Sequence, residues 1–157
     1  MSSDVRWLSA EQQLLWRGWL RLNAQLSTTL QRELQDDSGL SMPDFEVLVN
    51  LTDSDEGRVR VSDLATQMLW ERSRLSHHVT RMERRGVVQR VDCPSDGRGA
   101  FVVITPEGRK AIEGAAPGHV DAVRRLVFDG LQDDEVATMS ALVDKLLARM
   151  DAPAPPD

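Results

Sequence analysis

The sequence predicts a mainly α-helical protein with one small β-hairpin near its middle. Apolar residues recur every three or four positions over both ends of the chain, as they do in amphipathic helices. Between these ends, two short helical segments share a tight connection and the second is rich in arginine, which is typical of a helix-turn-helix. Two strand candidates around a turn follow directly. Together these observations predict a winged helix-turn-helix with N- and C-terminal dimerisation helices.

The first predicted helix covers residues 9–36, with Ser9 as its N-cap and Gly39 beyond its end. Its apolar stripe consists of Leu15, Trp19, Leu22, Leu26 and Leu30. The second helix begins at Ser41, which forms a variant of the capping box with Asp44. Its expected buried side consists of Phe45, Leu48, Val49 and Leu51.

A short third helix is predicted to begin at its N-cap, Ser62. Its expected inward-facing residues are Leu64, Ala65, Met68 and Leu69. A fourth helix runs to Arg85, and Gly86 supplies its left-handed C-cap. The buried stripe of this helix consists of Leu75, Val79 and Met82. The opposite side is therefore free to meet a partner.

The apolar period changes after the fourth helix. Residues 87–91 and 100–104 are strand candidates, and a segment rich in turn-forming residues lies between them. A Thr-Pro-Glu start at Thr105 begins another helix, which we expect to kink or break at Pro117-Gly118. A last amphipathic helix begins near residue 132.

These elements predict the organisation of the chain. Residues 1–40 form an N-terminal dimerisation helix, 41–106 a winged helix-turn-helix region, 107–150 the C-terminal dimerisation helices, and 151–157 a disordered tail. The terminal apolar stripes are wider than one copy can bury, so we expect a symmetric homodimer. The alternative is that both stripes close onto their own chain.

The composition fits about one folded domain, with 157 residues of which 41% are apolar and 28% charged. No apolar run approaches the ~20 residues that span a bilayer, and we see no secretory pattern. A single cysteine, Cys93, excludes an internal disulfide framework and favours a reducing cytoplasm. We find no metal-ligand spacing, no cofactor motif and no set of residues for an enzyme active site.

Positive charge is concentrated in residues 58–98. This segment contains nine arginines and five acidic residues, a net charge of +4, whereas residues 1–57 carry −6 and residues 99–157 carry −4. Clustered basic residues in an otherwise acidic chain are typical of a nucleic-acid-binding module. The alternative is a solvated charged surface that meets no partner.

Polar and basic side chains lie on the predicted outer side of the fourth helix. The candidates for DNA contact are Ser73, Arg74, Ser76, His77 and Arg81. His78 is expected on the same side. Arginine can bind guanine O6 and N7 together, and serine or histidine can reach base edges or phosphates. The sequence therefore predicts that this helix enters the major groove of double-stranded DNA.

Arg98 lies at the tip of the predicted hairpin between Gly97 and Gly99, which let the backbone bend sharply. An arginine on such a tip can enter a narrow minor groove, where the potential is most negative. Asp96 is placed to hold this arginine by a salt bridge. An exposed loop ion pair without a partner is the alternative, since exposed pairs contribute only ~0–1 kcal/mol.

Five motifs follow one another in the middle of the chain. They are Ser62-Asp63-Leu64-Ala65, the helix from Ser73 that ends in Met82-Glu83-Arg84-Arg85-Gly86, Val87-Val88-Gln89-Arg90, Asp96-Gly97-Arg98 and Ile104-Thr105-Pro106-Glu107-Gly108. In this order they resemble the MarR family of bacterial winged-helix regulators. The resemblance implies a homodimeric DNA-binding transcriptional regulator whose recognition helix enters the major groove. By position, the recognition contacts are Ser73, Arg74, Ser76, His77 and Arg81, and the wing pair is Asp96 and Arg98.

The resemblance also implies a repressor that is released by a small aromatic or phenolic ligand. The candidates for lining its pocket are Trp16, Trp19 and Phe45. Arg17 or His119 is the candidate anion partner, although tryptophans at helical spacing are more often core or dimer contacts. Two other functions stay open, namely a winged-helix protein-interaction module without DNA binding and a redox-sensing regulator that acts through Cys93.

Overall fold

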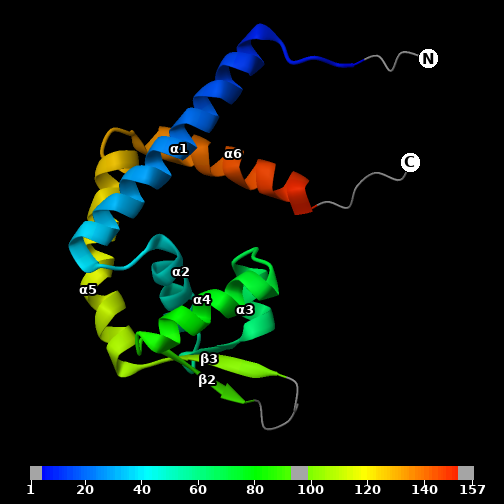
Figure 1. Cartoon of the computed structure of the whole chain (residues 1–157). Helices are drawn as coiled ribbons and strands as arrows, with labels where there is room; N and C mark the ends of the chain where they lie inside the picture. The colour runs from blue at the N-terminus through cyan, green and yellow to red at the C-terminus, as the bar shows by residue number, and fades with distance from the viewer. Residues whose placement is uncertain (1–4, 93–98, 152–157) are drawn as a thin grey trace. The chain divides into compact units, whose positions relative to one another are not determined.

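The computed structural model describes residues 5–92 and 99–151 (Figure 1). These residues contain six α-helices, one π-helical segment and three strands. The helices are α1 (Ala10–Ser38), α2 (Met42–Thr52), α3 (Val61–Gln67), α4 (Arg72–Arg84), α5 (Pro106–Val123) and α6 (Asp133–Asp151), with a π-helical segment at Arg124–Phe128. The chain divides into two units, residues 1–120 and residues 121–157. The predicted mainly α-helical fold with a small hairpin is confirmed.

The three strands form one antiparallel sheet in the order β1-β3-β2. They are β1 (Arg58–Arg60), β2 (Val88–Asp92) and β3 (Ala100–Ile104). Val102 of the central strand pairs with Val59 on one side and with Arg90 on the other. The hairpin of β2 and β3 confirms the prediction, whereas β1 was not predicted. Its three residues are too few to show alternation, and its partner strand lies far along the chain.

The core of residues 1–120 lies where α2, α3 and α4 meet the sheet. Its fully buried side chains include Leu48, Leu51, Leu64, Leu75, Val79, Met82, Val88 and Val102. The predicted stripe of α4 is thus confirmed, because all three of its residues are inaccessible to solvent. Burial on this scale fixes one side of α4 and leaves its other side to the solvent.

The predicted starts of α1, α2 and α5 and the predicted end of α1 agree with the structure. Ser9 and Ser41 each accept a hydrogen bond from a main-chain N–H three residues later, and both helices have a complete capping box. Thr105 accepts from the N–H of Gly108 in the same way. Gly39 adopts a left-handed φ of 71° after α1. These caps are local signals, which is why the sequence alone reveals them.

The boundaries of α3 differ from the prediction. Arg60, not Ser62, is the N-cap residue, because β1 runs directly into the helix and leaves no room for a separate cap. Leu69 was expected to face inward but is 92% exposed. It adopts a left-handed φ of 53°, and the N–H of Trp70 donates to the carbonyl of Ala65. This Schellman motif turns the chain away before Leu69 can reach the core.

Helix α5 runs without a break from Pro106 to Val123 and contains Pro117, so it is not interrupted at Pro117-Gly118, where the sequence predicted a kink or break. Pro117 and Glu113 are both exposed, so the carbonyl that loses its helical partner can be hydrated. The irregular helical geometry comes later, in the π-helical segment Arg124–Phe128.

Apolar side chains near both ends of the chain remain exposed. In the first unit they include Trp7, Leu15, Trp16, Trp19 and Leu22. In the second unit they include Met139, Leu142, Leu146, Leu147 and Met150 of α6, which lie on the predicted stripe. These stripes therefore keep a surface that another copy of the chain could cover.

Candidate nucleic-acid interface

Helix α4 presents all five predicted recognition residues to solvent. They are Ser73, Arg74, Ser76, His77 and Arg81. His78 was expected on the same side but is only 6% exposed. Its place next to Val79 puts it on the flank of the buried stripe, where it contacts Asp44 of α2. The prediction for His78 was therefore wrong, because a polar partner inside the core makes its burial possible.

Arg90 of β2 fixes the hairpin against α4. Its guanidinium donates hydrogen bonds to the carbonyl and hydroxyl oxygens of Ser76, at 2.6 and 3.1 Å, and to Thr80 Oγ1 at 2.9 Å. Its main-chain N–H donates to Glu83 Oε1 at 2.8 Å. Sequence reasoning missed this role, since only the fold brings β2 beside α4.

Arg74 has an aromatic partner in the turn of the helix-turn-helix. Its guanidinium lies 3.9 Å from the ring centroid of Trp70. A guanidinium over an indole face is a favourable cation–π arrangement. The contact restrains the guanidinium of Arg74 near the start of α4, on the side where the sequence predicts DNA contact.

A buried carboxylate lies behind α4. Asp44 is 2% exposed, and its carboxylate accepts from Arg85 at 2.8 Å and from the N–H of Ser41 at 3.1 Å. His78 Nε2 lies 3.1 Å from its other oxygen. Burial would raise the pKa of Asp44, but the hydrogen bonds from His78, Arg85 and Ser41 outweigh it and hold that pKa well below its usual range. This carboxylate is therefore ionised, and it joins α2 to α4.

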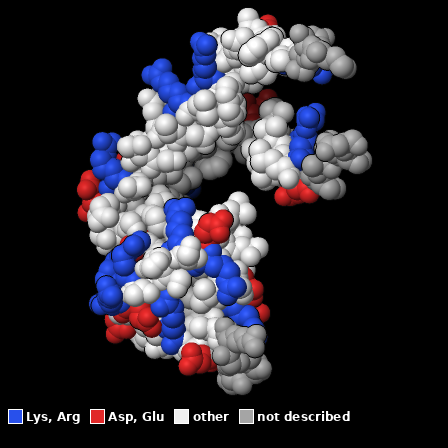
Figure 2. Space-filling model, turned by 45° about the vertical axis from the view of Figure 1, so that its right-hand side comes forward, with Lys and Arg blue, Asp and Glu red and all other residues white. Residues whose placement is uncertain are grey.

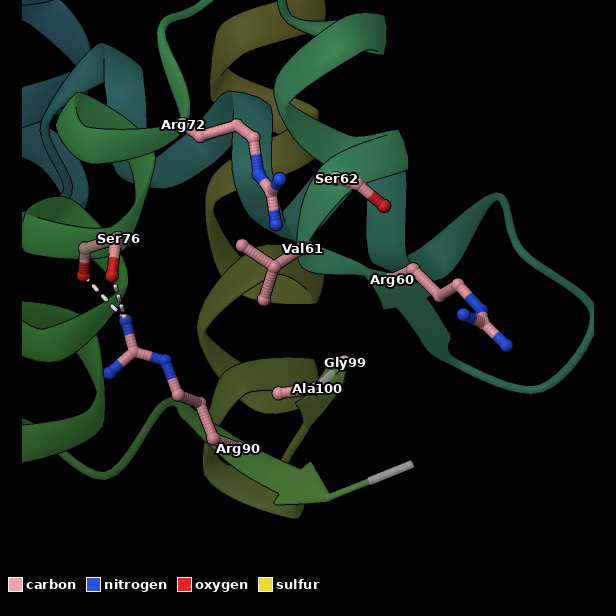
Figure 3. Close-up of a pocket in the computed structure, with 8 residues that line it drawn as sticks. All are labelled: Arg60, Val61, Ser62, Arg72, Ser76, Arg90, Gly99 and Ala100. Carbon is pink, nitrogen blue, oxygen red and sulfur yellow. Dashed lines mark hydrogen bonds between the residues drawn. The ribbon is translucent and has the colours of Figure 1, made fainter. Parts of the chain in front are cut away.

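A groove of about 510 Å³ opens beside α4 (Figure 3). Its lining residues are Arg60, Val61, Ser62, Arg72, Ser76, Arg90, Gly99 and Ala100. Figure 3 shows Arg72 reaching into the hollow, whereas Arg90 turns to Ser76 and Arg60 points away. The groove is thus lined by cations and hydroxyls, which suits an anionic group.

The charge on this face is mixed rather than uniform. Figure 2 shows basic side chains standing beside acidic ones over the lower part of the view, which holds the helix-turn-helix and the sheet. In the sheet, the guanidinium groups of Arg58 and Arg60 lie over the ring of Phe101, at 4.9 and 5.4 Å from its centroid. The basic residues thus differ in their partners, and the side chains of α4 stay the main candidates for contact.

The predicted wing pair, Asp96 and Arg98, lies outside the described residues, as does Cys93. The strands that carry this segment are paired up to Asp92 and Ala100. The structure therefore gives a fixed base for the predicted wing.

The structure does not bring the predicted ligand-pocket residues together. Phe45 is buried, and its ring centroid lies 4.6 Å from that of His119, whose pKa burial lowers. Trp16 and Trp19 are 52% and 42% exposed on the first half of α1. At ~1.5 Å per residue, Trp19 lies about 22 Å along the helix from Leu34, the buried residue of α1. The pocket stays a prediction.

Two further features bound the chemistry of the described part of the chain. Its histidine, cysteine and acidic residues form no group of three that could hold a metal ion. None of its helices combines the length and apolar character needed to cross a membrane.

Comparison with known proteins decides the family. The model of the MarR family matches residues 40–99. The transcriptional regulator HosA of Escherichia coli O111:H- is 31% identical over 127 residues, which cover 81% of this chain and 90% of the relative. The chain belongs to the MarR family.

Solved MarR-family structures extend the match to the flanking helices. AbsC of Streptomyces coelicolor has 40% identity and a TM-score of 0.88, over 93% of this chain and 98% of AbsC. Sco3205 of the same organism, crystallised in complex with DNA, has 41% identity and a TM-score of 0.89, over 98% of this chain and 97% of Sco3205. These relatives are named as transcriptional regulators, so membership confirms the predicted class, a DNA-binding transcriptional regulator.

Proposed function

We propose that this MarR-family chain acts as a homodimeric repressor that binds a pseudo-palindromic site in double-stranded DNA. One observation carries the proposal, namely the exposure of Ser73, Arg74, Ser76, His77 and Arg81 on the side of α4 opposite its buried stripe. This side combines short hydroxyl donors near the helix start with longer cationic donors. A helix that enters the major groove uses such a set to contact base edges and phosphates.

Each recognition residue has a distinct proposed part. Arg74 and Arg81 supply guanidinium donors that match guanine O6 and N7. Ser73 lies at the start of α4, where exposed N–H groups favour phosphate. Ser76 Oγ accepts from Arg90, so its own hydroxyl proton is available to DNA. The cationic groove beside α4, with Arg72 reaching into it, is suited to a backbone phosphate.

The wing completes the proposed interface. The hairpin of β2 and β3 is anchored to α4 by Arg90, and the segment between the strands contains Asp96 and Arg98. We expect Arg98 to enter the minor groove beside the site of α4 and Asp96 to hold it there. The rigid base supports a wing that approaches DNA together with the recognition helix.

The dimer follows from the unburied apolar stripes. We assign residues 1–40 and 107–150 to dimerisation and residues 41–106 to DNA binding. The predicted tail lies outside the described residues from residue 152 on. Exposed tryptophans and leucines of α1 and exposed leucines of α6 support this division. Two-fold symmetry then sets the half-sites about 10 bp apart. Binding to chromosomal DNA also implies a cytoplasmic protein.

A small aromatic or phenolic effector is the proposed signal for release. Trp16, Trp19 and Phe45 are its proposed lining residues, in the dimer rather than in one copy. The tilted contact of Phe45 with His119, with ring centroids 4.6 Å apart, supports an aromatic environment around this histidine. An NMR titration with simple phenolic acids would test the proposed effector site, because a bound ligand should broaden or shift the indole N–H signals of Trp16 and Trp19.

Fluorescence anisotropy tests the central proposal, with a labelled duplex selected from genomic fragments by the wild-type protein. Arg81→Ala should weaken binding about fivefold to 150-fold, since a good bidentate arginine is worth about 1–3 kcal/mol. Lys110→Ala, which removes one exposed charge from α5, is the matched control and should change affinity little. Affinity should fall steeply with salt because bound phosphates release counterions.

The proposal would be contradicted by a wild-type protein that is monomeric in analytical ultracentrifugation and binds no DNA duplex at low salt. Retention of a protein partner from nuclease-treated lysate under the same conditions would favour the protein-interaction alternative.

A further inference from the structure

His78 is the buried histidine of α4, and both of its ring nitrogens face charged side chains. Nδ1 lies 3.0 Å from Nη2 of Arg81, and Nε2 lies 3.1 Å from Oδ1 of Asp44. His78 is 6% exposed, whereas Arg81 is exposed on the same helix. His78 therefore lies between the core of the protein and a candidate DNA contact.

The chemistry of the two partners fixes the roles of the ring nitrogens of His78. A guanidinium can only donate, so Nδ1 of His78 accepts from Arg81. The proton of the neutral ring then belongs to Nε2, which faces the carboxylate of Asp44. Asp44 is itself held by Arg85 and by the N–H of Ser41. A continuous chain of polar contacts thus runs from the start of α2 to the surface of α4.

Packing also fixes the imidazole ring. Trp70 meets it edge to face, with ring centroids 5.5 Å apart and an interplanar angle of 81°. Trp70 also contacts the guanidinium of Arg74. The acceptor for Arg81 is therefore held in place on one side by Asp44 and on another by an indole.

We propose that His78 is a positioning residue that holds the guanidinium of Arg81 ready for DNA. The inference rests on the proposed function, because it takes Arg81 as a DNA contact. The bond uses one N–H of Nη2, so most guanidinium donors remain for bases or phosphates. A long side chain that is ordered before binding loses less conformational entropy when it binds.

A double-mutant cycle on the full-length protein distinguishes positioning from a structural role. His78→Phe keeps a ring beside Trp70 but removes the acceptor, and His78→Gln keeps both an acceptor and a donor. With the duplex selected by the wild-type protein, His78→Phe should weaken binding about threefold to tenfold, the effect of freeing one long side chain. His78→Gln should restore much of the affinity.

The decisive comparison uses the Arg81→Ala background. If His78 acts through Arg81, adding His78→Phe to Arg81→Ala should cause no further loss of affinity. The two single variants should also relax the base preference at the same position of each half-site. Thermal unfolding of every variant shows that the folded proteins are being compared, and His78→Leu replaces His78→Phe if the latter does not fold.

The inference and the proposed function fail in different ways. Equal losses from His78→Phe with and without Arg81 would overturn positioning and leave DNA binding in place. Wild-type affinity in His78→Phe, or no effect of Arg81→Ala, would also overturn the positioning role of His78. A wild-type protein that binds no duplex at low salt would instead overturn the proposed function itself.

Discussion

Arg90 on β2 donates hydrogen bonds to both the carbonyl and the hydroxyl oxygen of Ser76 on α4, at 2.6 and 3.1 Å. One side chain thereby joins the base of the hairpin to the middle of the helix that carries the predicted recognition residues. Its further bond to Thr80 lies one turn along the same helix. The hairpin and α4 are consequently expected to approach DNA as one rigid body.

Removing this connection should destabilise the protein. We expect Arg90→Met, which keeps the aliphatic stem, to lower the free energy of unfolding by about 1–3 kcal/mol, because several charge-assisted hydrogen bonds are lost. Urea denaturation measures the change. Arg84→Met, at an exposed position of α4, is the control and should lie within about 0.5 kcal/mol of the wild type. Equal stability of both variants would show that the contact of Arg90 with α4 contributes nothing.

Gly108 at the start of α5 should tolerate no side chain. A Cβ there would lie 2.1 Å from the carbonyl oxygen of Val87 and 2.9 Å from Ile104 Cγ1. Since a main-chain carbonyl cannot easily move aside, we expect Gly108→Ala to cost at least about 2 kcal/mol. Gly114→Ala in the same helix meets no described heavy atom within 4 Å and should stabilise it by about 0.5–1 kcal/mol. Thermal unfolding of Gly108→Ala and Gly114→Ala tests both expectations. Equal melting temperatures of the two variants would contradict the close contact between Gly108 and the carbonyl oxygen of Val87.

Leu69 offers an unusual route to stabilisation. It combines a left-handed φ of 53° with 92% exposure, so its side chain gains little from burial. Leu69→Gly removes ~1–2 kcal/mol of backbone strain but adds freedom to the unfolded chain, for a net gain of up to about 1 kcal/mol. Leu69→Val should lower stability, because a β-branched residue fits this conformation poorly. Chemical denaturation at one protein concentration compares the three, and a large loss in Leu69→Gly would reveal a contact made by Leu69 in the dimer.

Asp44 should make stability depend on acidic pH. Its folded pKa is depressed below the ordinary value of 3.8, so its contribution is fully present above that value and is lost as the pH falls toward the folded pKa. Asp44→Asn should cost about 1–3 kcal/mol at pH 7, and the difference from wild type should shrink below about pH 4. Unfolding curves from pH 7 to pH 3 test this. Glu46→Gln, at an exposed position of α2, should run parallel to the wild type.

Local signals made much of the fold predictable from sequence. The caps at Ser9, Ser41 and Thr105 are satisfied within three residues, so their patterns need no knowledge of the rest of the molecule. The stripe of α4 repeats with the helical period, which predicts its buried and exposed sides. For the same reason, the exposure of the five predicted recognition residues could be read from the sequence, and the structure confirms that exposure.

The features that escaped prediction depend on contacts between distant segments. Strand β1 exists because β3 pairs with it, and His78 is buried because α2 supplies Asp44 as its partner. The hydrogen bonds of Arg90 to α4 form only when the hairpin packs beside that helix. Leu69 was mispredicted for another reason. The apolar pattern of α3 extends to this residue, but the backbone there adopts a left-handed φ and leaves the helix.

The stack of Arg74 on Trp70 gives the protein an optical reporter of its own. Trp70 is the tryptophan of the helix-turn-helix, whereas Trp7, Trp16 and Trp19 all belong to the N-terminal end of the chain. Once these three are replaced by phenylalanine, the remaining ultraviolet emission comes from one indole whose face is covered by a cation. If Arg74 binds DNA as proposed, its contact with Trp70 is altered and the intensity and wavelength of the emission should change, so DNA binding can be followed without an attached dye.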